Sequence, residues 1–221
     1  MHGFLTTPHD GVAVDLSGGS FLWESPWTTP LPQIQSATSH NDFGLDLNGK
    51  EVGVFSDFND YTGGAYCSGA PFRGSVVQFP MSSWPNLLEP LCIVNEPTDV
   101  AWEISFRDWK SSPWVAFSAM NTSAAEYFNS DASYQSPSSS NWNVYSGEIV
   151  LARIDANNDP TKIYRLTLSH SRQQQGFWAL PRATISRDGK YVIFDSNAAW
   201  GQTGCGSITD CTDIYLIGPL L

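Results

Sequence analysis

Two histidines, two arginines and a carboxylate are the side chains whose types and positions could support chemistry at one site. The segment SHND contains His40 and Asp42. The segment SHSR contains His170 and Arg172, and three glutamines follow it; Arg182 lies ten residues beyond Arg172. Histidine beside arginine suits general-base chemistry on a carboxylated sugar. A structural role, in which each histidine bonds to neighbouring backbone at the start of a strand, is the alternative.

A divalent metal is the one cofactor that these residues suggest. Two histidines with a carboxylate can hold such an ion, and His40 and His170 are the candidate ligands. The chain has only four histidines, and it contains no Gly-x-Ser-x-Gly motif, phosphate-binding loop or His-Glu-x-x-His motif. The motifs therefore leave open whether the protein is an enzyme or a binding module.

Tryptophan supplies a second kind of candidate contact. Trp178 and Trp200 fall in or beside expected loops, where an indole ring could stack on a sugar ring. Packing between sheets is the alternative role for both. We include them, with His40, Asp42, His170, Arg172 and Arg182, among the candidate ligand-binding residues.

The charge of the chain restricts the ligand. Twenty-two acidic residues against 11 basic ones give a formal net charge of −11 in 221 residues. Such a chain is unsuited to a phosphate backbone, so we expect no nucleic-acid partner. A neutral or cationic ligand, carbohydrate or protein, fits better. No run of 18 apolar residues occurs, so we expect no membrane span.

Four cysteines indicate the compartment. Cys205 and Cys211 bracket a five-residue loop, which predicts a disulfide between them, and Cys67 with Cys92 could form a second. An even number of cysteines in glycine-rich loops favours a secreted or periplasmic protein. Four free thiols in a cytosolic protein are the alternative. Residues 1–8 do not have the pattern of a signal peptide, so we expect further sequence upstream.

An internal repeat defines the elements that must position these side chains. Residues 47–56 (LNGKEVGVFS) and 187–196 (RDGKYVIFDS) are alike, and Gly49 and Gly189 lie 140 positions apart. Asn-Gly or Asp-Gly before an apolar run predicts a hairpin turn with positive φ at its central residues. A third, weaker copy lies midway, at residues 102–118. The spacing therefore predicts a unit of about 70 residues.

Each unit is expected to form a four-stranded antiparallel sheet. A short β-branched strand recurs after each hairpin, and a fourth strand follows a polar turn. Naming the strands a to d, the chain reads c-d, a-b-c-d, a-b-c-d and a-b-c. The expected boundaries of these units are 1–34, 35–97, 98–172 and 173–221. The pattern predicts an all-β, partial β-propeller of about three blades that forms an open arc, completed by further blades upstream. A β-sandwich is the alternative.

The last unit resembles the WD40-like repeat of TolB-type propellers. Residues 181–197 (PRATISRDGKYVIFDSN) and then 213–217 (DIYLI) match its turn-strand pattern, with Arg187 in place of the usual proline. The chain also resembles, more distantly, oligogalacturonate-lyase-type propellers, which hold a metal on histidine and glutamine. It lacks their closely spaced His-x-His pair. The resemblance implies a propeller fold and leaves the function open.

The expected topology places the candidate residues on one face of the arc. The loops between strands b and c are the long ones, and they share a face with the connections from d to the next a. Long loops gathered on one face indicate binding. We therefore expect a ligand- or protein-binding module of an exported protein. The alternative is a polysaccharide lyase or other carbohydrate-active enzyme with a metal-assisted His/Arg site completed by other blades.

Overall fold

The computed structural model describes the backbone of fourteen strands and the side chains of part of the chain. The described residues are 10–14, 20–24, 30–35, 41–57, 75–80, 91–95, 99–106, 113–121, 144–145, 147–171, 181–196 and 212–220. Of these, residues 10–14, 20–24, 30–35, 41, 55–57, 75, 99–102 and 119–121 are described by their backbone alone.

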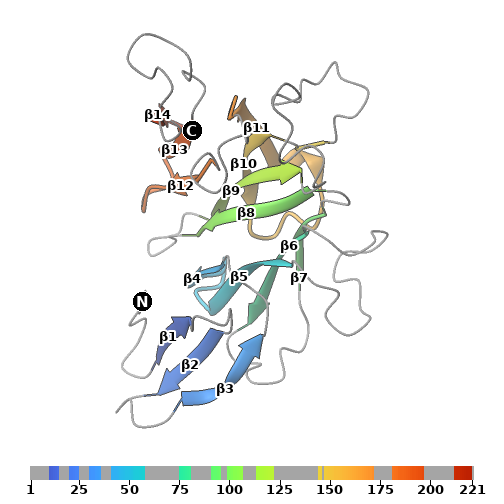
Figure 1. Ribbon diagram of the computed structural model, residues 1–221. Helices are drawn as coiled ribbons and strands as arrows, with labels where there is room; N and C mark the ends of the chain where they lie inside the picture. Colours follow the sequence, from blue (N-terminus) through green and yellow to red (C-terminus); the bar gives the residue numbers. More distant parts are fainter. Residues whose placement is uncertain are drawn as a thin grey trace.

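The described strands form four antiparallel sheets (Figure 1). The first sheet contains β1 (Asp10–Val14), β2 (Ser20–Glu24) and β3 (Pro30–Gln35). The second contains β4 (Asn41–Leu45), β5 (Glu51–Asp57), β6 (Ser75–Pro80) and β7 (Leu91–Val94). The third contains β8 (Asp99–Ser105), β9 (Trp114–Asn121), β10 (Glu148–Arg153) and β11 (Ile163–Leu168), with a 3-10 turn, η2 (Pro160–Lys162), before β11. The fourth contains β12 (Thr184–Ile185), β13 (Val192–Ser196) and β14 (Asp213–Ile217).

The order of strands within each sheet follows the order of the chain. Within each sheet, every strand after the first pairs with the one before it, so each sheet is an antiparallel meander. The second and third sheets have the four strands expected of a full unit, and the fourth has the expected three. β1 pairs with β2 and β14 pairs with β13, so the described strands leave the sheets open.

The first sheet departs from expectation, because residues 30–35 add a third strand to the predicted pair. Pro30 and Pro32 lack backbone N–H groups, and a segment containing them is not predicted to be a strand. β3 lies at the edge of the sheet beside β2, and its pairing shifts register on both sides of Phe21. An edge strand tolerates proline because one row of its backbone groups needs no partner within the sheet.

Both faces of the third sheet are buried. We call the face toward the preceding sheet the leading face and the face toward the following sheet the trailing face. Leading-face side chains of the third sheet pack against the second sheet, and they include Val115, Phe117, Val150 and Ala152. Trailing-face side chains pack against the fourth sheet, and they include Ala116, Ile149 and Leu151. Three stacked sheets make two apolar interfaces, whereas a two-sheet sandwich has one.

The predicted hairpin glycines are in the left-handed conformation. Gly49 has φ +73° and Gly189 has φ +68°. The amide of Gly49 donates to the carbonyl of Asp46 at 3.0 Å, and that of Gly189 to the carbonyl of Ser186 at 2.9 Å. The residues before the two glycines do not have positive φ, so these turns differ from the predicted type, which requires it at both central positions. One left-handed glycine suffices because each loop is longer than two residues.

Candidate functional site

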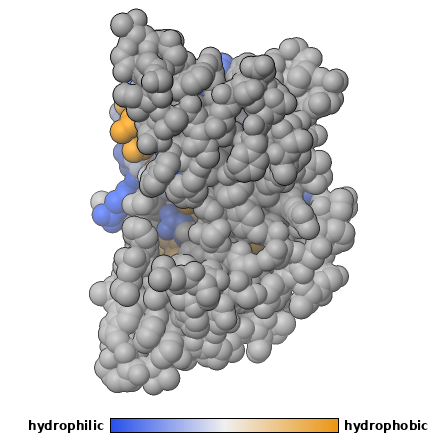
Figure 2. Space-filling view, viewed as in Figure 1, coloured by the Kyte–Doolittle hydropathy of each residue, from blue (hydrophilic) through white to orange (hydrophobic). Residues whose placement is uncertain are grey.

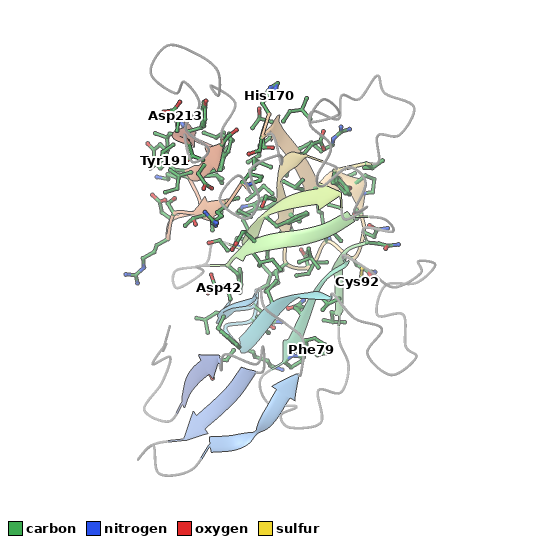
Figure 3. All side chains as sticks on the ribbon, in the orientation of Figure 1. Asp42, Phe79, Cys92, His170, Tyr191 and Asp213 are labelled. Carbon is green, nitrogen blue, oxygen red and sulfur yellow. The ribbon has the colours of Figure 1, made fainter. Side chains whose placement is uncertain are left out.

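The structure describes three of the seven candidate ligand-binding residues: Asp42, His170 and Arg182. The remaining predicted site and disulfide residues lie outside the described part of the chain: His40, Arg172, Trp178, Trp200, Cys67, Cys205 and Cys211. Figure 3 shows Asp42 on β4 and His170 well away from it, beyond the end of β11. Convergence of the seven residues on one site therefore stays a prediction.

Asp42 joins the second sheet to the third. Its carboxylate is buried and accepts the backbone N–H of Phe43 at 2.9 Å. The other oxygen accepts the backbone N–H of Phe106 at 2.8 Å, immediately after β8 of the third sheet. A buried amide without a partner is costly, so this second bond is a specific link between the two sheets.

The same link recurs between the third and fourth sheets with a different side chain. The hydroxyl of Ser105 accepts the backbone N–H of Ile185 at 3.2 Å. Asp42 and Ser105 occupy equivalent rows, because their rows continue through Val54 and Ala116 to Gln78 and Leu151, each the fourth residue of its third strand. The sequence gives no sign of this equivalence, since an aspartate and a serine do not align by type.

Arg182 connects three segments at the start of the fourth sheet. Its guanidinium donates to Asp195 of β13 at 3.1 Å and lies 3.6 Å from the carboxylate of Glu103 in β8. The backbone N–H of Arg182 also donates to Asp195, at 2.6 Å. Two carboxylates around one guanidinium leave a net negative charge, which fits a cationic or neutral ligand better than an anionic one.

His170 is exposed and has a left-handed backbone, with φ +54°. Ser169 and Ser171 on either side of it are buried. The hydroxyl of Ser196 donates to the carbonyl of Ser169 at 2.6 Å. The backbone N–H of Ser169 donates to the carbonyl of Gly147 at 2.7 Å. These bonds fix the backbone around His170, so its side chain projects from a well-anchored turn.

Long connections emerge at one end of the sheets, which we call the loop-bearing end. There β5 connects to β6 through 17 residues (58–74), β9 to β10 through 26 (122–147) and β13 to β14 through 16 (197–212). At the opposite end, the first and second strands of these sheets are joined by 5 (46–50), 8 (106–113) and 6 (186–191) residues. The longest connections therefore share the end at which β11 finishes and His170 lies.

Polar groups gather at the same end of the sheets. Of the eight buried polar side chains among the described residues, five lie at or near the loop-bearing end: Ser118, Glu148, Ser169, Ser171 and Ser196. Ser118 donates across to the carbonyl of Pro181 at 2.5 Å, which ties β9 to the start of the fourth sheet. Polar groups held this way form a rigid base beneath the long connections.

An ion pair between Glu148 and Arg165 lies at the loop-bearing end, and it was not predicted from the sequence. Glu148 is buried at the start of β10, and Arg165 on β11 donates to both of its oxygens, at 2.6 and 2.5 Å. These bonds raise the pKa of the Arg165 guanidinium. The two residues are 17 positions apart, and a register shift in β10–β11 brings them together. Sequence spacing could not reveal that shift.

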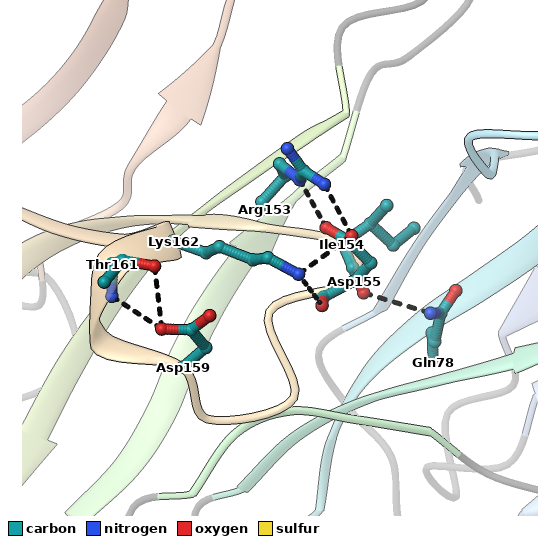
Figure 4. Close-up of polar contacts among 7 residues, drawn as sticks. All are labelled: Gln78, Arg153, Ile154, Asp155, Asp159, Thr161 and Lys162. Carbon is teal, nitrogen blue, oxygen red and sulfur yellow. Dashed lines mark hydrogen bonds and ion pairs between the residues drawn. The ribbon is translucent and has the colours of Figure 1, made fainter.

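A second charged cluster lies in the turn after β10 (Figure 4). Arg153 donates two hydrogen bonds to Asp155, and the ammonium of Lys162 lies 3.1 Å from the same carboxylate. The hydrogen bond from Arg153, supplemented by one from Lys162, holds the pKa of Asp155 well below its usual range. Since both cations are engaged within the turn, the cluster stabilises the turn at the end opposite the loop-bearing end.

Neither a metal cluster nor a membrane-spanning helix occurs in the described part of the chain. No group of three or more His, Cys, Asp or Glu side chains there could hold an ion. Among those residues, no helix has the length and apolarity to cross a membrane. Cys92 is disulfide-bonded, and its pairing with Cys67 stays a prediction because Cys67 lies outside the described residues.

Comparisons with known proteins give low similarities. No protein-family model matches the chain, and no curated protein matches it. Among solved structures, the chain is 12% identical to a complex of KlAtg21 with the coiled coil of AgAtg16, with a TM-score of 0.43, covering 88% of this chain and 48% of that one. It is 12% identical to a prolyl endopeptidase, with a TM-score of 0.43, covering 99% of this chain and 28% of that one.

A third solved structure is CoXyl43, a β-xylosidase/α-arabinofuranosidase from a compost microbial metagenome, at 14% identity and a TM-score of 0.46. That similarity covers 98% of this chain and 68% of CoXyl43. The chain spans less than half the length of the first two of these proteins. At such TM-scores the similarities do not identify a family, and the fold assignment rests on the sheets of this chain.

Proposed function

We propose that the chain is part of a propeller-type arc that binds a ligand through its loop-bearing end. The observation that carries this proposal is the concentration of long connections and buried polar groups at one end of successive meanders. Loops positioned by a rigid scaffold are where proteins place binding residues. The repeated contact from Asp42 to Phe106 and from Ser105 to Ile185 supports a regular scaffold, because each unit meets the next in the same way.

The described candidate residues have two different roles in this proposal, holding the site in place and contacting the ligand. Asp42 and Arg182 are engaged by neighbouring strands, so we infer that they hold the base of the site. His170 is exposed on the same end, so we infer that it contacts ligand together with Trp178 and Trp200. With a chain charge of −11, a neutral or cationic carbohydrate or a protein surface is the ligand class that fits.

Binding without catalysis is the function that these contacts favour. A metal-assisted lyase requires a coordinating cluster, whereas Asp42 and Arg182 make ordered contacts with protein groups. A carboxylate fixed by two backbone amides supports structure without needing an ion. The protein is expected to act in the secretory or periplasmic environment that its cysteines indicate.

A glycan array with neutral and cationic oligosaccharides tests this function. Positive glycans are then titrated by calorimetry into the wild type, into His170→Ala and into a Trp178→Ala/Trp200→Ala double variant. We expect both variants to bind about tenfold more weakly or worse, because each loses contacts at the loop-bearing end. Lys50→Ala, in the turn at the opposite end, is the control and should bind as the wild type does. Unchanged affinity in both site variants would contradict the proposal.

A further inference from the structure

His170 has a backbone conformation that few side chains adopt. Its φ of +54° lies in the left-handed region, where the Cβ atom of an L-residue comes too close to the following carbonyl oxygen. Residues other than glycine are uncommon there, and they persist where the surrounding structure enforces the conformation. Strained residues of this kind cluster at binding and catalytic sites. The contacts on either side of His170 must therefore hold it in place.

Three other residues besides glycine share the left-handed conformation within the described part of the chain: Tyr145, Asn157 and Asn158. Asparagine tolerates this conformation because its short polar side chain can form local hydrogen bonds. Tyr145 packs against the apolar cluster between the second and third sheets. His170 is neither an asparagine nor buried. Burial of an apolar side chain therefore does not offset its strain, and a role in binding is the reading that its exposed position favours.

Hydrogen bonds from two sheets hold the backbone beside His170. The backbone N–H of Ser169 donates to the carbonyl of Gly147 in the third unit, and the hydroxyl of Ser196 in the fourth sheet donates to the carbonyl of Ser169 at 2.6 Å. Within the turn, the N–H of Ser171 donates to the hydroxyl of Ser169 at 3.3 Å. A peptide unit is planar, so the bond from Ser196 fixes the orientation of the unit on which the φ of His170 depends.

Ser196 is itself held firmly. It is the last residue of β13, the central strand of the fourth sheet, and it pairs with Asp213 of β14. Its exposed fraction is 1%, so water does not compete for its hydrogen bond. Figure 3 shows Asp213 and His170 toward the same end of the molecule. Figure 2 shows a small hydrophilic area at the top of the molecule, where β11 ends in Figure 1.

We propose that Ser196 is a positioning residue for ligand binding, which holds from the fourth sheet the turn that presents His170 of the third unit. This inference rests on the proposed function, in which His170 contacts a neutral or cationic carbohydrate. It places the site at the junction of two adjacent units, because neither sheet alone fixes the orientation of the imidazole. A side chain held in its binding orientation before the ligand arrives loses less conformational entropy on binding.

A double-mutant cycle tests this role. The probe is the neutral or cationic oligosaccharide that gives the strongest wild-type signal on the glycan array, titrated by calorimetry into the full chain. Ser196→Ala should weaken its binding by about tenfold. In a His170→Ala background the same change should cause little further loss, because the hydroxyl acts through His170. A general loss of structure would weaken binding by the same factor in both backgrounds.

Ser105→Ala is the matched control. Ser105 is also a buried serine, and its hydroxyl accepts the backbone N–H of Ile185, so it too joins the third and fourth sheets. It lies at the opposite end of β8 from the loop-bearing end. Ser105→Ala should lower the urea midpoint and bind the oligosaccharide as the wild type does. Circular dichroism checks that each variant is folded.

A comparison of two His170 variants tests the strain without any ligand. Glycine adopts positive φ freely and alanine does not, so His170→Gly should unfold at a higher urea concentration than His170→Ala. A midpoint for the glycine variant at or below that of the alanine variant would overturn the inference. So would wild-type affinity in Ser196→Ala, or an equal loss in both backgrounds, and these outcomes would leave the proposed function intact. A wild type that binds no oligosaccharide on the array would overturn the proposed function and this inference together.

Discussion

Asp42 shows what a residue's type can and cannot reveal about its role. Its position at the start of an inner strand could be predicted from the repeat, and so could the polar character of that end of the sheet. Its partner could not, because the amide of Phe106 lies 64 residues away in another unit. Ser105 performs the same role with a hydroxyl. The contact depends on the register between strands, which residue types do not encode locally.

Replacing Asp42 tests whether the link between sheets depends on any acceptor or on the carboxylate. Asp42→Ala should lower the free energy of unfolding by about 1–3 kcal/mol, because the amide of Phe106 is left buried without a partner. Asp42→Ser, which copies the residue type of Ser105, should recover part of that loss. Urea denaturation of the wild type and the two Asp42 variants measures these changes in the free energy of unfolding. Equal stability of the Ala and Ser variants would contradict a shared role for the two positions.

Asp155 should make stability depend on pH at the acidic end of the range. Its pKa is lowered in the folded protein by Arg153 and then Lys162, whereas an unfolded chain has the ordinary aspartate pKa of about 3.9. The stabilisation is therefore complete above about pH 5 and declines as the pH falls below about 4. The urea midpoints of the wild type and Asp155→Asn, measured from pH 7 to 2, should converge on acidification. A constant gap down to pH 2 would show that Asp155 acts through something other than its charge.

At the scale of the elements, hairpins and apolar alternation were predictable and edge behaviour was not. The glycine turns at Gly49 and Gly189, and the strands that follow them, lie where the repeat predicts. β3 was missed because its prolines argue against a strand, while its edge position makes them tolerable. Local sequence determines which segments can extend, and the neighbouring strand determines which of them pair.

The trailing face of the third sheet should tolerate no added volume. Ala116 is completely buried between β10 and the fourth sheet, so Ala116→Leu should destabilise the protein by about 1–3 kcal/mol through overpacking. Ile193 occupies the equivalent position in the fourth sheet and is exposed. Ile193→Leu keeps the volume of an exposed side chain, so it should change the free energy of unfolding by less than about 0.5 kcal/mol. Thermal and urea unfolding measure both, and a tolerated leucine at 116 would mean that the two sheets are not in close contact there.

The second, third and fourth sheets form a series in which each packs against the next one in the chain. One apolar cluster lies between the second and third sheets, and another lies between the third and fourth. The two clusters share no residue, because they use opposite faces of β9 and β10. In such a series, stability is approximately a sum of terms for each unit and each interface. The sequence predicts the units through their period, but the separation into two clusters follows from the packing.

Double substitutions should reveal this separation. Val54 and Val115 belong to the first cluster and Val192 to the second, and all three are buried. Each single Val→Ala change should cost about 1–3 kcal/mol, from lost burial and the cavity left behind. The costs of Val54→Ala and Val192→Ala should add to within about 0.5 kcal/mol, because the sites share no contacts. Those of Val54→Ala and Val115→Ala should depart from additivity by more, since these residues line one cluster. Urea unfolding of the three single and two double variants measures the coupling free energy of each pair. Strong coupling between positions 54 and 192 would mean that the sheets form one continuous core.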